Sequence, residues 1–232
     1  MSDKFPTWVP ISGEPLPGYG NRPHGDRSGY RQLTLDELKS VAQAFHPRIT
    51  LAEMDEMPMP EFEKRFYTSK ENIALNEAQR TSYAKLDNWQ ALCASVRRSL
   101  PPAYEVADRT YPRYYPTYMI VIDAPVEPGS IDDRFLVVHM SYLVPYYFYY
   151  ELHSRRIDGK IRRDPLRYEV TPVFADALAS IEREIAERYG YWRMSAETAL
   201  VKMPEIYVNG HYDFLDGDPP TLQDALFTPQ RW

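Results

Sequence analysis

The centre of the chain is a block of strand-forming segments, and this block limits the folds that are open to the sequence. Residues 118–122, 135–144 and 146–157 are rich in β-branched and aromatic side chains. Asp158-Gly159 then offers a type I′ hairpin turn, with residues 160–170 as the partner strand. Consecutive strands separated by turn residues predict an antiparallel sheet in sequence order.

Helical patterns precede this block. A Thr-Leu-Asp-Glu capping box at 34–37 and apolar residues at helical spacing predict a helix over 35–45. The Met-Pro pairs at 57–60 predict an irregular stretch after it. A longer apolar stripe predicts the first major helix over 72–100, either continuous or broken near Thr81.

Helical patterns also follow the block. Thr171-Pro172 starts a predicted helix with an apolar stripe, which ends at Gly190 as its C′ residue. Residues 191–208 fit one more strand or a short helix, and residues 221–224 begin a final helical turn. Helices, then strands, then helices favour an α+β fold. We expect an antiparallel sheet of three to five strands packed against two or three helices.

Length and composition fit one cytoplasmic domain. A chain of 232 residues can bury a large core, so we expect a single domain over 1–232. Proline and glycine density in residues 1–32 predicts an extended arm that lies against this domain. The single cysteine, Cys93, cannot form an internal disulfide and favours a reducing compartment. The N-terminus lacks the apolar stretch of a signal peptide, so we expect a cytoplasmic protein with no membrane partner.

Common catalytic motifs are missing from the sequence. It contains no Gly-x-Ser-x-Gly elbow, no phosphate-binding Gly-Lys-Ser/Thr loop and no Gly-x-Gly-x-x-Gly fingerprint. Cys93 lies on the apolar stripe of the 72–100 helix, which predicts a buried, unreactive thiol. The acids at Asp132-Asp133 and in the 213–218 loop can bind a cation, but aspartate also favours turns, and we prefer that interpretation. We expect no catalytic residue, no cofactor and no metal.

Three groups of side chains are candidates for binding a partner. They are a run of tyrosines in a chain with 19 Tyr, a basic hairpin around Asp158-Gly159, and an acidic loop before Pro219-Pro220. Structural alternatives stay open for the first two, since a tyrosine-rich sheet also packs its rings half-buried and charge on a hairpin also protects a sheet edge from aggregation. A net charge of −6 makes nucleic acid an unlikely main partner, so we favour a protein. The partner-binding candidates are Tyr146, Tyr147, Tyr149, Arg155, Arg156, Asp213, Asp216 and Asp218.

The C-terminal part of the chain carries Met-Pro-Glu-Ile at 203–206, Gly217, and Thr-Leu-Gln-Asp-Ala-Leu-Phe at 221–227. This stretch resembles the tail of several bacterial immunity-type proteins that are encoded beside polymorphic or type VI toxins. The resemblance implies a cytoplasmic immunity protein that blocks a cognate toxin by occupying its active site or an adjoining surface. No functional residue of these immunity-type proteins can be assigned to this sequence from the resemblance.

Two other classes of protein remain open. One is an enzyme that uses His139 or His153 with a nearby carboxylate, since the two histidines can approach each other across neighbouring strands. The other is a structural subunit of a larger secretion or phage-derived assembly, in which copies exchange the N-terminal arm. A deep pocket with converging polar groups favours the enzyme, whereas a shallow aromatic surface favours the binding protein.

Overall fold

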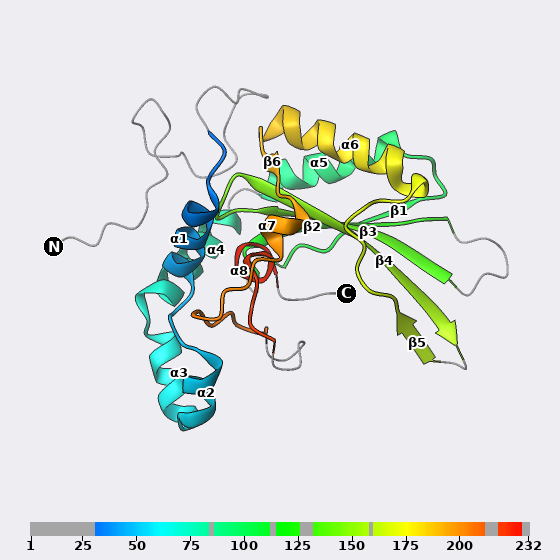
Figure 1. Ribbon diagram of the computed structural model, residues 1–232. Coiled ribbons are helices and arrows are strands. Elements are labelled where there is room, and N and C mark those ends of the chain that lie inside the picture. Colours follow the sequence, from blue (N-terminus) through cyan, green and yellow to red (C-terminus); the bar gives the residue numbers. More distant parts are fainter. Residues whose placement is uncertain are drawn as a thin grey trace.

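The computed structural model describes residues 31–83, 86–111, 115–125, 132–157, 160–211 and 218–228, and within these ranges it confirms the α+β fold. One open sheet crosses the molecule, and helices lie on either side of it (Figure 1). The arm predicted at 1–32 lies outside the described residues except for its last two.

The sheet follows the chain order β1-β2-β3-β4-β5, and each neighbouring pair is antiparallel. A short sixth strand pairs with the start of β4 in the parallel direction. Strand bounds are β1 Glu105–Asp108, β2 Thr117–Asp123, β3 Asp132–Ser141, β4 Tyr146–Ile157, β5 Lys160–Arg163 and β6 Trp192–Arg193.

The three central strands agree with the prediction, and the outer ones differ from it. The partner strand predicted over 160–170 ends at Arg163, because Pro165 cannot donate to a ladder, and pairing resumes only as a bridge between Arg167 and Glu151. The predicted turn at Asp158-Gly159 lies outside the described residues. Strand β1 was not predicted, because two of its four residues are acidic and the segment forms no apolar run.

Among the described residues, five helices precede the sheet: α1 Leu35–Phe45, α2 Leu51–Glu56, α3 Met59–Tyr67, α4 Lys70–Tyr83 and α5 Leu86–Ser99. The predicted capping box of α1 is present. The irregular stretch predicted at 57–60 is wrong, because Met59 begins α3 and Pro60 lies in its first turn, where a missing N–H loses no helical bond. The long helix predicted over 72–100 is two helices, α4 and α5, in line with the alternative of a break near Thr81.

The C-terminal part adds the 3₁₀ helix η1 Pro172–Phe174 and the helices α6 Ala175–Arg188, α7 Ala196–Ala199 and α8 Leu222–Leu226. The predicted helix after Thr171 is therefore η1 followed by α6. Gly190 follows this helix with a φ of 63°, as expected for a C′ glycine.

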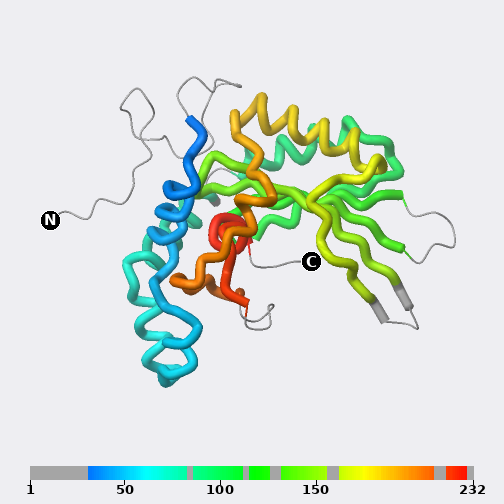
Figure 2. Tube along the Cα trace, in the orientation of Figure 1, coloured from blue at the N-terminus to red at the C-terminus, as the bar shows by residue number. Residues whose placement is uncertain are grey.

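Helices cover both faces of the central strands. On one face, α5 and α6 pack together, and the fully buried Trp89 stacks on Tyr118 with ring centroids 5.4 Å apart. On the other face lies the α8 segment, where the Ser141 hydroxyl donates to the Leu226 carbonyl (2.7 Å) and the rings of Phe148 and Phe227 are 6.0 Å apart. The tube in Figure 2 shows β4 and β5 continuing beyond these helices as a projecting hairpin.

Two buried histidines make the fold sensitive to acid. His139, on β3, is fully buried, and burial lowers its pKa to about 3. Its Nε2 lies 3.5 Å from the Tyr150 hydroxyl, while Nδ1 has no hydrogen-bond partner among the described residues. Burial also lowers the pKa of His46 to about 4, although Nε2 contacts the Ala225 carbonyl at 2.8 Å.

We predict that His139→Leu flattens the acid limb of the stability curve. Because the folded pKa is below the unfolded value of 6.5, the unfolded chain binds more protons between about pH 3 and 6.5, and stability falls as pH decreases through this window. Urea unfolding at several pH values measures the slope, which His139→Leu reduces by up to about 1.4 kcal/mol per pH unit. An unchanged slope would show that His139 does not contribute to the pH dependence of stability. The substitution Asp218→Asn, at an exposed position, serves as a control.

Candidate functional site

A histidine and three charged side chains meet at the base of the β4–β5 hairpin, and we refer to these four residues as the hairpin cluster. Asp132 begins β3, His153 and Arg155 lie on β4, and Asp164 follows β5. The ladder pairs Asp132 with Arg155, and the amide of Asp164 donates to the carbonyl of His153 at 2.8 Å. The backbone therefore brings all four side chains to one face of the sheet.

His153 is the centre of the hairpin cluster. Its Nδ1 lies 3.0 Å from the Asp164 carboxylate, and its Nε2 lies 3.6 Å from that of Asp132. The Arg155 guanidinium lies beside the same acids, 3.3 Å from Asp164 and 4.0 Å from Asp132. The histidine side chain is 8% exposed, whereas that of Arg155 is 45% exposed, so the imidazole is enclosed and the guanidinium reaches solvent.

This geometry allows two kinds of chemistry. A carboxylate that accepts from one imidazole nitrogen fixes the ring, which is how many general acid–base histidines are oriented. The same contacts also link strands β3 and β4 to the residue that follows β5, so they hold the hairpin in place against the body. Of the two roles, holding the hairpin is the one that all four side chains share.

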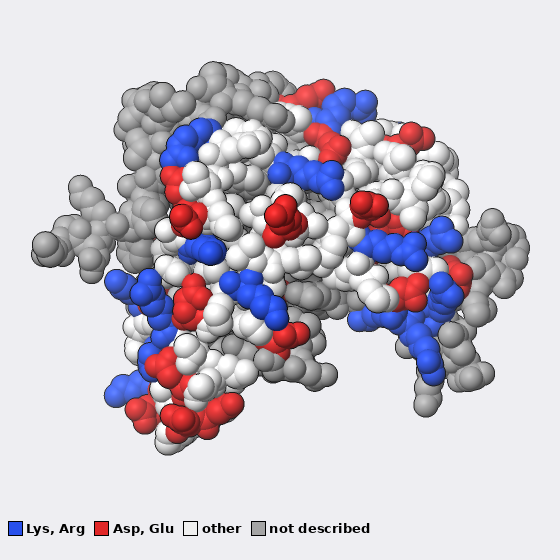
Figure 3. All heavy atoms as spheres, in the orientation of Figure 1, with Lys and Arg blue, Asp and Glu red and all other residues white. Residues whose placement is uncertain are grey.

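Basic side chains surround the hairpin cluster. Arg134 is opposite His153 in the ladder and Arg162 is opposite Arg155, and Arg134, Arg162 and Arg163 are all exposed. Residues 151–167 contain six Lys and Arg against three Asp and Glu, although the whole chain has a net charge of −6. In Figure 3, basic side chains gather at the end of the molecule where Figure 1 places β4 and β5.

The predicted tyrosine contacts are buried side chains that join parts of the fold. Tyr146, Tyr147 and Tyr149 are between 5% and 7% exposed, so none of them offers a ring to a partner. The hydroxyl of Tyr147 donates to Glu182 of α6 (2.9 Å), and the guanidinium of Arg193 lies 4.2 Å from the centre of the Tyr149 ring. The expectation of an aromatic binding surface on β4 is therefore wrong, because the packing of both sheet faces encloses this strand.

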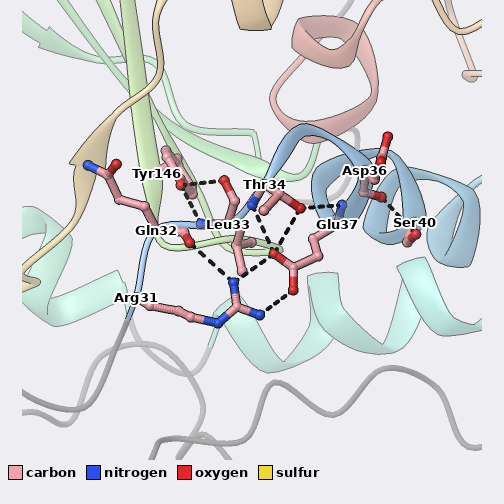
Figure 4. A network of polar contacts seen from close by, with 8 residues as sticks. All are labelled: Arg31, Gln32, Leu33, Thr34, Asp36, Glu37, Ser40 and Tyr146. Atoms are coloured by element: carbon pink, nitrogen blue, oxygen red, sulfur yellow. Dashed lines mark hydrogen bonds and ion pairs between the residues drawn. The ribbon is translucent and has the colours of Figure 1, made fainter.

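Tyr146 connects the sheet to the segment that leads into α1. Its hydroxyl accepts from the amide of Leu33 at 2.8 Å (Figure 4). Nearby, Arg31 forms an ion pair with Glu37, and this hydrogen-bonded guanidinium lowers the pKa of Glu37 to about 2. The capping threonine, Thr34, donates from its backbone to the same carboxylate.

The remaining predicted contacts have separate outcomes. Arg155 is exposed and belongs to the hairpin cluster, as described above. The backbone of Arg156 pairs with Ile161, but its side chain lies outside the described part of the chain, as do Asp213 and Asp216. Asp218 is exposed and forms an ion pair with Lys202 at 3.2 Å. Exposed pairs of this kind contribute little to stability.

A second acid–histidine pair is enclosed in the core. His211 Nδ1 lies 3.4 Å from the Asp224 carboxylate, and both side chains are fully buried. Nε2 of the same histidine contacts the Asp218 carbonyl at 2.7 Å, and Asp224 caps α8 through the amide and hydroxyl of Thr221. These contacts fix the α8 segment, in which all five helical residues, Leu222 to Leu226, are buried.

Other candidate chemistry in the sequence is also internal. Cys93 is buried as predicted, and burial raises the pKa of its thiol. His139 is paired with Phe148 and His153 with Arg134, which places the two histidines on opposite faces of the sheet, so they do not approach each other. Across the described ranges there is no group of three His, Cys, Asp or Glu side chains that could hold a metal ion.

Sequence reasoning missed Asp164, although a signal for it was present. A two-residue turn at Asp158-Gly159 pairs residue 157 with 160, and counting back along both strands places Asp164 opposite His153. The strand register therefore predicts the contact between Asp164 and His153, whereas the pattern of apolar residues alone does not predict it.

Comparison of the chain with known families, with curated proteins and with solved structures found no match. No helix in the described ranges has both the length and the apolar character needed to cross a membrane.

We predict that Asp164→Ala loosens the hairpin without affecting the core. The substitution removes the carboxylate that contacts both His153 and Arg155, at a cost of about 1 kcal/mol for partly exposed pairs. Hydrogen exchange should then be about fivefold faster for β4–β5 amides and unchanged for β2–β3 amides. Asp218→Ala removes an exposed pair elsewhere and should change neither set. Equal exchange in the hairpin of Asp164→Ala and of the unaltered protein would show that the cluster does not hold it.

Proposed function

We propose that this chain is a cytoplasmic immunity-type protein that neutralises a bacterial toxin by binding an acidic surface of it through the β4–β5 hairpin. The observation that carries the proposal is the group of exposed arginines on a hairpin that projects from the body of the fold (Figures 2 and 3). An exposed cation on a fixed support favours recognition of an opposite charge.

The hairpin cluster prepares the hairpin for binding. Contacts from His153 and Arg155 to the two aspartates restrain the strands before any partner arrives. Less conformational entropy is then lost on association than for a free loop. Exposed Arg162 and Arg163 stand next to these restrained positions and provide charge for steering the encounter.

The class of partner comes from the resemblance of residues 203–227 to immunity-type proteins. The matching side chains of α8 are buried, so the likeness concerns packing and says nothing of the contact surface. The hairpin supplies that surface on the basis of its exposure and charge. The acidic loop with Asp213, Asp216 and Asp218 would instead suit a basic toxin face, and the proposal prefers the hairpin arginines and hence an acidic face.

The geometry of His153 favours one second candidate, an enzyme that uses acid–base chemistry. The 3.0 Å contact between its Nδ1 and Asp164 orients the ring as a catalytic histidine requires. In that case His153→Gln abolishes turnover in a panel of hydrolase substrates while the folded content remains. Binding of a toxin that survives His153→Gln, without turnover, rejects this candidate.

We predict that the double substitution Arg162→Glu and Arg163→Glu weakens the toxin complex at least about tenfold. Reversing two exposed charges replaces attraction by repulsion and chiefly slows association. The partner is sought as the product of the adjacent gene, first by tagged pull-down with mass spectrometry and then by size-exclusion chromatography. Binding kinetics at low and high salt measure the effect, which salt reduces.

Arg98→Glu is the matched control, since Arg98 is an exposed arginine in the last turn of α5. It should leave the association rate within about twofold of the original, as expected for a charge outside the interface. A chain that forms no complex, beside a neighbouring gene whose product is harmless, would refute the immunity proposal. If the double substitution of Arg162 and Arg163 leaves the affinity of the complex unchanged, the hairpin is not the surface that binds the toxin.

A further inference from the structure

The two edges of the sheet differ in whether their outward backbone groups have hydrogen-bond partners. At one edge, α5 lies alongside β1, and the guanidinium of Arg97 donates to the Val106 carbonyl at 2.6 Å. A carbonyl of this edge strand that β2 does not use is thereby satisfied by a side chain. The opposite edge is β5, for which the described part of the chain supplies one partner strand, β4, on its inner side.

The register shows which groups of β5 point outward. Since the amide of Asp164 donates to the His153 carbonyl, residues 153 and 164 form a hydrogen-bonded pair. Pairs alternate along an antiparallel ladder, so Arg162 directs its backbone groups towards Arg155. The N–H and C=O of Ile161 and Arg163 therefore point away from the sheet. In the described ranges no hydrogen bond reaches the outward backbone groups of these two residues.

Positive charge lies on both faces of this open edge. Arg162 shares a face with Arg155, while Arg163 is paired with Ser154 and lies on the other face. Both Arg162 and Arg163 are exposed. A strand that paired with β5 would have cations beside it on either face, and cross-strand pairs of opposite charge stabilise such an arrangement.

We infer that the outer edge of β5 is a docking site for a short, extended, acidic strand of the protein partner. The strand would continue the sheet by hydrogen bonding to the backbone of Ile161 and Arg163, with aspartate or glutamate side chains beside Arg162 and Arg163. This inference rests on the proposed function and names the form and charge of the partner's contact segment.

The structure also limits the length of the added strand. The β4–β5 ladder ends at Arg163, and Pro165 follows two residues later without an N–H to donate. The edge then departs from regular pairing until the bridge between Arg167 and Glu151. The docked segment is therefore short, and side-chain charge contributes more to its selection than a long ladder would.

A charged, short edge strand also serves in many proteins to prevent pairing. That protective role would use the same arginines. It differs in one respect, because the outward amides of a protective edge stay without a strand partner when the toxin binds. The two roles are therefore distinguished by the hydrogen bonding of Ile161 and Arg163 in the complex.

The test is a pair of variants at one position, measured with the toxin partner recovered by the pull-down. Arg163→Pro removes an outward N–H and blocks strand addition but keeps the inner pairing, which does not use this N–H. Arg163→Thr removes the same side chain and retains the N–H. We expect Arg163→Pro to bind at least about tenfold more weakly than Arg163→Thr, a difference of about 1.4 kcal/mol.

Hydrogen exchange provides the second measurement and checks that Arg163→Pro still folds. In the free protein, we expect fast exchange at Ile161 and Arg163 and slower exchange at Arg162 and Asp164, whose amides face β4. In the complex, Ile161 and Arg163 become protected at least about tenfold. Retention of the slow amides in Arg163→Pro shows that β5 stays paired with β4.

The outcomes separate this inference from the proposed function. A complex that Arg163→Pro and Arg163→Thr form equally well, or one that leaves Ile161 and Arg163 unprotected, overturns strand addition while the binding function stands. Failure to form any complex with a toxin refutes the proposed function, and the inference falls with it.

Discussion

The pairing of Ile157 with Lys160 sets the register of the β4–β5 hairpin, and the charges of the surface depend on that register. It places His153 beside Asp164 and Arg155 opposite Arg162. A shift of β5 by one residue would move Arg162 and Asp164 to the other face of the sheet, away from Arg155 and His153. The hairpin cluster and the outward backbone of β5 are thus two results of one alignment.

Strand β4 has this influence because it is held along its whole length. Its first half is buried, and its tyrosines contact three separate parts of the fold: the segment before α1, helix α6, and Arg193 of β6. Its second half leaves the core at the hairpin cluster, where polar contacts among His153, Arg155 and Asp164 replace apolar packing. The tyrosines at the start of β4 therefore serve to join the layers of the fold, and the arginines of the hairpin are its exposed side chains.

The sequence allowed the central strands, α1 and the helix after Thr171 to be predicted, because apolar period and capping residues are local signals. It did not reveal the burial of Tyr146 and Tyr147, since a tyrosine run reads the same whether one face of a strand is covered or both. Helix α3 was missed because proline ends helices in most positions and is tolerated in a first turn. The cluster around His153 depends on pairing between distant residues, which local patterns do not contain.

The most direct measurement of the hairpin as a partner surface is photocrosslinking from a benzophenone side chain introduced in place of Arg162. Its position on the exposed face of β5 predicts a covalent adduct with the toxin, mapped to an acidic segment of that protein. The same group introduced in place of Arg98, on α5, should give no adduct. Crosslinking from α5 with none from β5 would contradict the assignment of the hairpin as the binding surface.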